Sequence, residues 1–218
     1  MKMHHILIAV LAFGLCSCGN NTEKQENTNN EPINEPMEQE QTTKPVAYMT
    51  KDISPEGLVK IYEALGVKPA EGQRVAVKIS TGESGGHNYL KPELIKDLVN
   101  TVNGTIVECN TAYGGSRQDV KKHWETIKEH GFLDIAKVDI MDEFGEMQIP
   151  VEDTTYIKYD IVGEHLANYD FMLNLAHFKG HAMGGFGGVL KNQSIGVAST
   201  AGKAYIHSCG YTTDPADC

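Results

Sequence analysis

The sequence predicts an α/β fold built on a mostly parallel sheet with helices on both of its faces. Three observations lead to this prediction. Apolar segments of strand length alternate with amphipathic segments of helix length, glycines follow several of the helical segments, and polar, glycine-bearing loops follow three of the strands. This alternation is typical of sheets whose parallel strands are joined by helices. Residues 46–218 are enough for one such domain and thin for two.

Each predicted element follows from its local pattern. A helix begins at Ser54 and Pro55, because serine caps helices well and proline fits the first turn. The segment 92–103 places its apolar residues at the spacing of a helix with one buried face. The acidic stretch 141–155 is expected to be irregular. In chain order, the expected elements are a helix at 54–65, a strand at 74–80, a helix at 92–103, a strand at 105–108, a helix at 117–130, a short strand within 132–140, a helical turn at 163–168, a strand at 171–176, a loop at 177–188 and a helix from 189.

The N-terminus resembles a bacterial lipoprotein signal. Lys2 precedes an apolar run at 6–15, and small residues then lead to Cys18, which would be acylated. We predict a lipoprotein signal peptide at 1–18, with an ordinary secretory signal as the alternative. Residues 19–45 are polar and acidic and are expected to be a disordered linker. The expected location is the bacterial cell envelope, periplasmic or surface-facing, with the lipid anchor as the membrane contact.

Composition excludes several classes of protein. The 19 basic and 29 acidic residues give a net charge of −10, so nucleic acid is not an expected partner. The longest apolar run has about ten residues, too few to span a bilayer. Cys109, Cys209 and Cys218 remain in the folded part, and spacing alone leaves open whether the last two form a disulfide. The sequence has no Cys-x-x-Cys pair, so these residues alone do not indicate a complete iron–sulfur or zinc site.

Polar side chains gather in the three loops that follow predicted strands. The carboxyl ends of parallel strands meet at one edge of a sheet, where the N-termini of the following helices favour anions. The first loop offers Glu83 and Asn88, and the second offers Thr111 and Arg117. We expect these side chains to surround one site for a small-molecule anion or a cofactor, with Glu83 as a hydrogen-bond acceptor rather than an acid–base group.

The third loop carries the most specific pattern, with five glycines within 180–188. Glycine lets a backbone approach a ligand closely. Lys191 lies near the start of the next helix, where an ammonium group is unfavourable unless an anion or a covalent partner compensates it. The alternative is a packing turn with Lys191 in solvent. His177 and His181, four residues apart, either share a helical face and bind a metal or are held apart by the glycines around them.

These motifs together resemble the bacterial domain of unknown function family 362. The resemblance rests on Thr-Gly-Glu at 81–83 with Asn-Tyr at 88–89, on Asn-Thr-Ala-Tyr-Gly-Gly-Ser-Arg at 110–117, and above all on the glycine-rich segment 177–192. It covers about 74–210. Family members are often described as iron–sulfur or ferredoxin-like proteins, and the family domain is longer than this chain. The resemblance therefore implies an incomplete domain, an N-terminal fragment whose iron–sulfur cluster would be completed beyond residue 218.

A more distant resemblance links His181, Lys191 and His207 to the nickel-pincer lactate racemases, through the order and spacing of these residues. It implies that Lys191 carries a tethered pyridinium cofactor, that His207 ligates nickel, and that His181 is the acid–base group for a 2-hydroxy acid. Neutral imidazole suits nickel, and histidine titrates in the range useful for proton transfer.

The sequence leaves three functions open, and it does not decide whether the protein is an enzyme. The first is an envelope lipoprotein that acts on a small, 2-hydroxy-acid-like anion with a nickel-pincer-like or other cofactor. The alternative is a metal-binding or iron–sulfur electron-transfer protein without turnover. A structural protein whose glycine loop only packs is a third reading. The candidate site residues are catalytic His181 and Lys191, metal-ligating His207 and His177, and cofactor-binding Lys191, Gly185, Gly187, Gly188, Asn192, Glu83, Asn88, Thr111 and Arg117.

Overall fold

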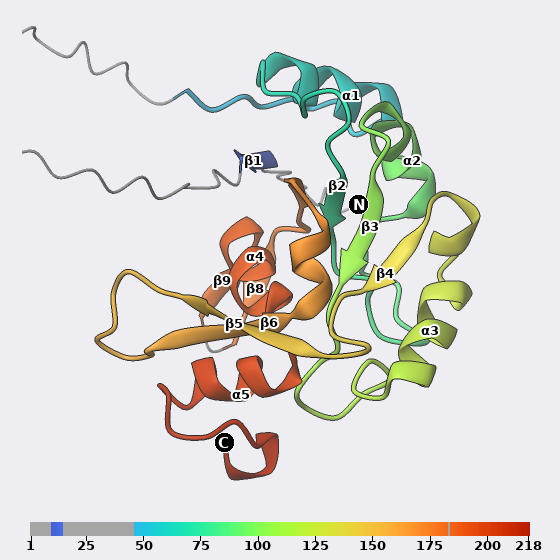
Figure 1. Cartoon of the computed structure of the whole chain (residues 1–218). Helices are drawn as coiled ribbons and strands as arrows, with labels where there is room; N and C mark the ends of the chain where they lie inside the picture. Colours follow the sequence, from blue (N-terminus) through green and yellow to red (C-terminus); the bar gives the residue numbers. More distant parts are fainter. Residues whose placement is uncertain (1–9, 15–45, 183) are drawn as a thin grey trace, which may run out of the picture.

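The computed structural model describes residues 10–14, 46–182 and 184–218, and it confirms the predicted α/β fold (Figure 1). The strands are β1 (Val10–Gly14), β2 (Val75–Lys78), β3 (Thr105–Glu108), β4 (Val138–Ile140), β5 (Glu146–Pro150), β6 (Tyr159–Gly163), β7 (Phe171–Leu175), β8 (Lys179–His181) and β9 (Gly185–Gly187). The helices are α1 (Pro55–Ala64), α2 (Pro92–Thr101), α3 (Val120–Glu129), α4 (Val189–Val197) and α5 (Thr200–His207), with short 3-10 helices η1 (Phe132–Asp134), η2 (Glu164–Asn168) and η3 (Pro215–Asp217).

The central sheet has the strand order β1-β7-β2-β3-β4. Strands β7, β2, β3 and β4 are parallel, and β1 runs antiparallel along the outer edge of β7. The chain proceeds from β2 to β3 to β4 in one direction and later returns to place β7 on the other side of β2. This reversal makes the junction of β2 and β7 a topological switch point, the place where open α/β sheets bind ligands beyond the carboxyl ends of their strands.

One face of the sheet is covered by α1, α2 and α3 (Figure 1). Val77 of β2 pairs in register with Ile106 of β3 and Leu173 of β7, and all three side chains are fully buried in the main apolar cluster. Ile95 and Leu98 of α2 belong to the same cluster. Full burial of each such side chain contributes roughly 1.5–3 kcal/mol, so this layer supplies much of the stability of the fold.

Side-chain caps set where the helices begin. The Ser54 hydroxyl accepts a hydrogen bond from the N–H of Gly57 at 3.0 Å, as expected for the start of α1. Helix α3 begins at Val120, later than the expected start at 117, because Asp119 caps it. As a result Arg117 lies in the loop before the helix rather than within its first turn.

The other face of the sheet is covered by α4 and by the β5–β6 hairpin, with α5 beside the hairpin (Figure 1). A smaller apolar cluster there includes Ala76, Val107 and Val162. Helix α5 approaches β6 so closely that a Cβ on Gly202 would stand 1.9 Å from the carbonyl oxygen of Ile161. Glycine is therefore required at this position for α5 to pack where it does.

The prediction that 141–155 is irregular was wrong, because Glu146–Pro150 forms strand β5 and pairs with β6. Its side chains alternate between exposed and half-buried, and Met147 and Ile149 pack on the smaller apolar cluster. This period of two decides the structure, despite the acidic residues around it. The expected loop at 177–188 contains the short β8–β9 hairpin, and α5 was not anticipated.

Most of the N-terminal predictions lie outside the described residues. The predicted signal peptide at 1–18 is described only at Val10–Gly14, which forms β1, and the predicted linker at 19–45 is not described. Among the helices of the described part, none combines the length and the apolar character needed to cross a bilayer. Cys209 and Cys218 are exposed free thiols.

Candidate functional site

A cavity of about 440 Å³ lies at the carboxyl ends of the central strands. Its wall combines Lys78 at the end of β2, Glu108 at the end of β3 and Ala176 directly after β7. Helix α4 contributes Lys191 from its first turn, and Gly188, directly before the helix, also lines the cavity. The three polar loops therefore border one cavity at the switch point between β2 and β7, where the topology favours a ligand site.

Cationic side chains dominate the cavity wall. Among the described residues that line it, five are Lys or Arg and two are Glu. The cations are Lys78, Arg117, Lys179, Lys191 and Lys203, and the carboxylates are Glu83 and Glu108. The chain as a whole has the opposite balance, with a net charge of −10. The cavity thus concentrates positive charge within an acidic protein, and its low-dielectric walls strengthen the resulting field.

One guanidinium engages both carboxylates of the wall. Glu83 accepts hydrogen bonds from Nε of Arg117 at 2.8 Å and from the N–H and hydroxyl of Ser116 at 2.9 and 2.8 Å, which joins the first loop to the second. Arg117 also forms an ion pair with Glu108. In the part of the chain that the structure describes, none of the four lysines of the wall forms an ion pair with a carboxylate.

Glu108 is the centre of a buried polar network. Its Oε2 accepts hydrogen bonds from the N–H and the hydroxyl of Thr81, at 2.8 and 2.5 Å. Nε2 of the fully buried His123 lies 3.4 Å from the same oxygen, and Nδ1 lies 2.9 Å from Oδ1 of Asn110. Burial acts to raise the pKa of Glu108, but Arg117 and then His123 lower this pKa well below its usual range. Glu108 is therefore a carboxylate at neutral pH.

Lys78 is almost completely buried and lines the cavity. Its Nζ donates hydrogen bonds to the carbonyl oxygen of Ile79 at 2.5 Å and to Oδ1 of Asn192 at 3.1 Å. Burial lowers the pKa of Lys78 to about 8, although the Glu108 carboxylate opposes this shift. The amide of Asn192 in turn donates to the Lys78 carbonyl oxygen and to Oδ1 of Asn174, so Asn192 joins α4 to β2 and β7.

Two further buried groups line the cavity from α5 and from the end of β3. Lys203 donates a hydrogen bond to the carbonyl oxygen of Ala198. Burial lowers the pKa of Lys203, while Cys109 and Asp142 oppose this shift. The Cys109 thiol donates to the carbonyl oxygen of Val197 at 3.2 Å, and burial raises its pKa to about 12. Cys109 is thus a protonated thiol at neutral pH, a form that is neither a nucleophile nor a metal ligand.

The outer wall brings two lysines together. Lys179 and His181 lie on β8, and Lys191 lies on α4. Burial lowers the pKa of Lys191, and the like charge of Lys179 lowers it further. Two ammonium groups that repel each other in a partly desolvated wall are stabilised when an anion binds between them.

The two predicted metal ligands occupy different positions. His177 lines the cavity, and its Nδ1 is buried with no hydrogen-bond partner among the described residues. His207 lies outside the wall, where its Nδ1 is 2.7 Å from the Tyr113 hydroxyl and the two rings stack. Burial and then the charge of Lys191 lower the pKa of His207. In the described part of the chain, no three His, Cys, Asp or Glu side chains are placed to hold a metal ion, so these side chains provide no metal centre by themselves.

Most of the predicted site residues line this one cavity. They are Glu83, Asn88, Thr111, Arg117, His177, His181, Gly187, Gly188, Lys191 and Asn192. Gly185 and His207 lie outside its wall, and Cys18 lies outside the described residues.

Sequence reasoning did not identify three of the buried charged residues of the site. Lys78 and Glu108 are each the last residue of a mainly apolar strand. A charged residue in this position could have been used to predict a buried charge at the site. Lys203 lies on a helix that was not predicted, and its local sequence contains no comparable signal.

The fold and the cavity define the class of protein: an α/β domain with a cation-lined cavity at the switch point of a parallel sheet. Comparison with protein-family models matches residues 75–216 to the Domain of unknown function (DUF362). The chain belongs to this family, as its loop motifs indicated. The match runs from β2 beyond α5 and therefore includes all three site loops. Neither a comparison with curated proteins nor one with solved structures gave a match.

Proposed function

We propose that this protein binds a small carboxylate anion, of the size and charge of a 2-hydroxy acid, in the cavity at the switch point, and that it acts there as an enzyme. The observation that carries the proposal is the excess of positive charge in the wall, five cations against two carboxylates that are both paired to Arg117. A cavity of about 440 Å³ has the size of a small-molecule site.

The energetics of burial support an anion as the ligand. Lys78 and Lys203 are almost fully buried, and desolvation of an ammonium group costs several kcal/mol unless charges or hydrogen bonds compensate it. Lys179 and Lys191 repel each other at the outer wall. An anion in the cavity would compensate the desolvation of Lys78 and Lys203 and the repulsion between Lys179 and Lys191. Both effects destabilise the empty folded protein, so both favour anion binding.

Thermal unfolding with added anions tests the binding proposal. Lactate and malate should raise the melting temperature of the wild-type protein at constant ionic strength, whereas glycerol should not. A ligand at about tenfold its Kd stabilises the folded state by roughly 1.4 kcal/mol, which is a shift of about 3–5 °C for a domain of this size. Lys191→Ala should weaken binding about tenfold, because it removes one of the two outer charges.

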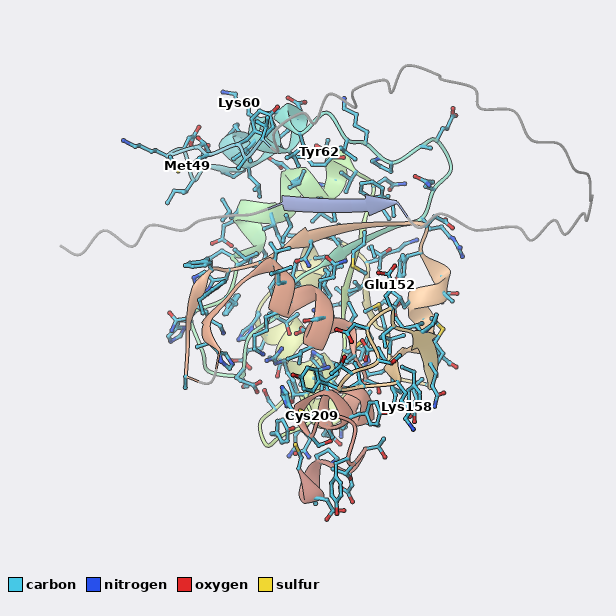
Figure 2. All side chains as sticks on the ribbon, turned by 90° about the vertical axis from the view of Figure 1, so that its left-hand side faces the viewer. Met49, Lys60, Tyr62, Glu152, Lys158 and Cys209 are labelled. Carbon is cyan, nitrogen blue, oxygen red and sulfur yellow. The ribbon has the colours of Figure 1, made fainter. Side chains whose placement is uncertain are left out.

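The matched control is Lys60→Ala. Lys60 is exposed on α1 and lies at the end of the molecule away from Cys209 (Figure 2). This variant removes one positive charge without altering the cavity, so its response to anions should equal that of the wild type. Equal stabilisation of wild type, Lys60→Ala and Lys191→Ala by the same anion would contradict a site at Lys191.

We further propose that the protein works in the bacterial cell envelope with a lipid anchor on Cys18. The order of Lys2, the apolar run at 6–15 and the small residues before Cys18 supports this location. In bacteria grown with radiolabelled palmitate, the protein should become labelled, and Cys18→Ser should abolish the label. Label that persists in this variant would contradict the anchor.

A further inference from the structure

Lys78, the most buried lysine of the cavity wall, has the hydrogen-bond partners of a neutral amine. A protonated lysine has three N–H donors and no acceptor, whereas a neutral amine has two N–H donors and one lone pair. Nζ of Lys78 has two acceptors, the carbonyl oxygen of Ile79 and Oδ1 of Asn192, and both are uncharged. These two bonds satisfy a neutral amine completely and leave its lone pair for a third direction.

We propose that Lys78 is a nucleophilic amine that forms an imine with a 2-oxo acid bound in the cavity. This inference rests on the proposed function for the binding of the carboxylate, and it adds a covalent step at one named atom. It also narrows the substrate class to carboxylates that carry a keto group next to the carboxylate.

Helix α4 passes close to the amine, and Gly196 leaves Nζ uncrowded by a side chain. A Cβ built on Gly196 would stand 3.1 Å from Nζ and 3.2 Å from Cε of Lys78, tighter than ordinary contact. Gly196 and Lys78 both line the cavity, so the space that a side chain would fill at this position lies next to the amine. Glycine inside a helix costs roughly 0.5–1 kcal/mol relative to alanine, so its presence here needs a local reason, and access to Nζ supplies one.

The charges that face Lys78 keep it reactive near neutral pH. Burial lowers its pKa, the Glu108 carboxylate opposes this shift, and the like charges of Lys203 and Arg117 lower the pKa further, while the neighbouring Cys109 thiol is uncharged at neutral pH. With a pKa of about 8, about one amine in ten is neutral at pH 7, compared with fewer than one in a thousand for an ordinary lysine. Buried lysines of this kind are the ones that act as Schiff-base nucleophiles in enzymes.

The covalent step is balanced and needs no oxidant or reductant. The lone pair of Nζ attacks C2 of the 2-oxo acid, the carbonyl π electrons move to oxygen, and a proton passes from nitrogen to oxygen to give a carbinolamine. The C–O bond then breaks, and the departing hydroxide takes up a proton and leaves as water. Neutral amine, ketone and one proton thus become a protonated imine and water. The proton is taken up from water.

Reductive trapping tests this proposal on the wild-type protein. The full chain is incubated with pyruvate and cyanoborohydride, which reduces an imine to a stable secondary amine, and the adduct is located by peptide mapping. We expect one reduced pyruvate per chain, on Lys78, at a level about tenfold or more above exposed Lys60, because far more of the Lys78 amine is neutral. Lactate has no ketone group and acetone has no carboxylate, so both should give little adduct at Lys78.

Two variants separate covalent reactivity from binding. Lys78→Arg cannot form the imine, so it should lose the adduct, whereas Lys60→Arg, which removes an exposed lysine, should keep the adduct on Lys78. Gly196→Ala places a methyl group against Nζ of Lys78 and should reduce the amount of trapped pyruvate several-fold. This variant keeps every lysine of the chain, so a lower yield would reflect access to Nζ. If Lys78→Arg does not fold, the mapping on the wild type and the response of Gly196→Ala decide the question.

The outcomes distinguish this inference from the proposed function. Stabilisation by lactate and pyruvate with no adduct on Lys78 would overturn the imine and leave the anion site standing. Adduct located on Lys191, or spread equally over Lys60 and the other exposed lysines, would also overturn it. Absence of both stabilisation and adduct would overturn the anion site and the imine together.

Discussion

The pH dependence of stability tests the burial of the Lys78 amine directly. In Lys78→Met the amine is replaced by an apolar group of similar length. The folded-state pKa of Lys78 is about 8 because of burial, compared with an ordinary value of 10.5. Between these two values the unfolded chain holds a proton that the folded chain has released, so the free energy of unfolding rises with pH. The wild type should therefore gain stability relative to Lys78→Met as the pH is raised from 7 to 9.5.

The size of this gain follows from the two pKa values. Near pH 7 the amine is protonated in both states and the linkage contribution is close to zero. At pH 9.5 the folded amine is almost wholly neutral while the unfolded amine is still mostly charged, which gives about 2 kcal/mol. The other titratable groups are present in both proteins, so their contributions largely cancel in the difference.

Urea unfolding followed by circular dichroism at pH 7, 8, 9 and 9.5 measures this difference. Lys60→Met serves as the control for loss of a lysine at an exposed position. The reasoning fails if the difference between wild type and Lys78→Met is flat over this range, or if it changes in favour of the variant.

Three other changes have expected outcomes. Gly202→Ala should destabilise the fold by about 3 kcal/mol, because its methyl group would overlap the carbonyl oxygen of Ile161; an unchanged urea midpoint would contradict the close packing of α5 on β6. Ser54→Ala should cost about 1 kcal/mol through loss of the α1 cap, without altering anion binding. The buried thiol of Cys109, whose pKa is raised to about 12, should resist iodoacetamide at pH 8 in the native protein while exposed Cys209 reacts, and rapid native labelling of Cys109 would show that it is accessible.

Local patterns in the sequence were sufficient to predict most of the fold. The start of α1 at Ser54 and the strand before Lys78 depend on capping chemistry and on short apolar segments, which neighbouring residues determine. The alternation of these elements then indicated a parallel sheet. Because the carboxyl ends of parallel strands share an edge, the sequence alone predicts that the three loops that hold Glu83, Thr111 and His177 lie at one place.

The parts of the site that were missed depend on contacts between distant segments. Nothing next to Lys78 in the chain shows that Asn192, over a hundred residues later, will accept its hydrogen bond. The pairing of Arg117 with Glu83 and Glu108 likewise depends on how the first two loops lie against each other in the folded protein. Strand β5 was missed for a different reason: it is short and lies in an acidic stretch, and the alternation of Met147 and Ile149 covers only a few residues.

The position of β1 links the central sheet to the proposed processing at Cys18. Val10–Gly14 lies within the segment predicted to be an export signal, and it pairs along the whole outer side of β7. Processing at Cys18 would take this strand away and leave the backbone N–H and C=O groups of Phe171–Leu175 on that side to water or to another strand. The precursor and the processed protein would then differ in their sheet as well as in length, with the newly uncovered strand being the one that leads directly into the glycine-rich loop of the cavity.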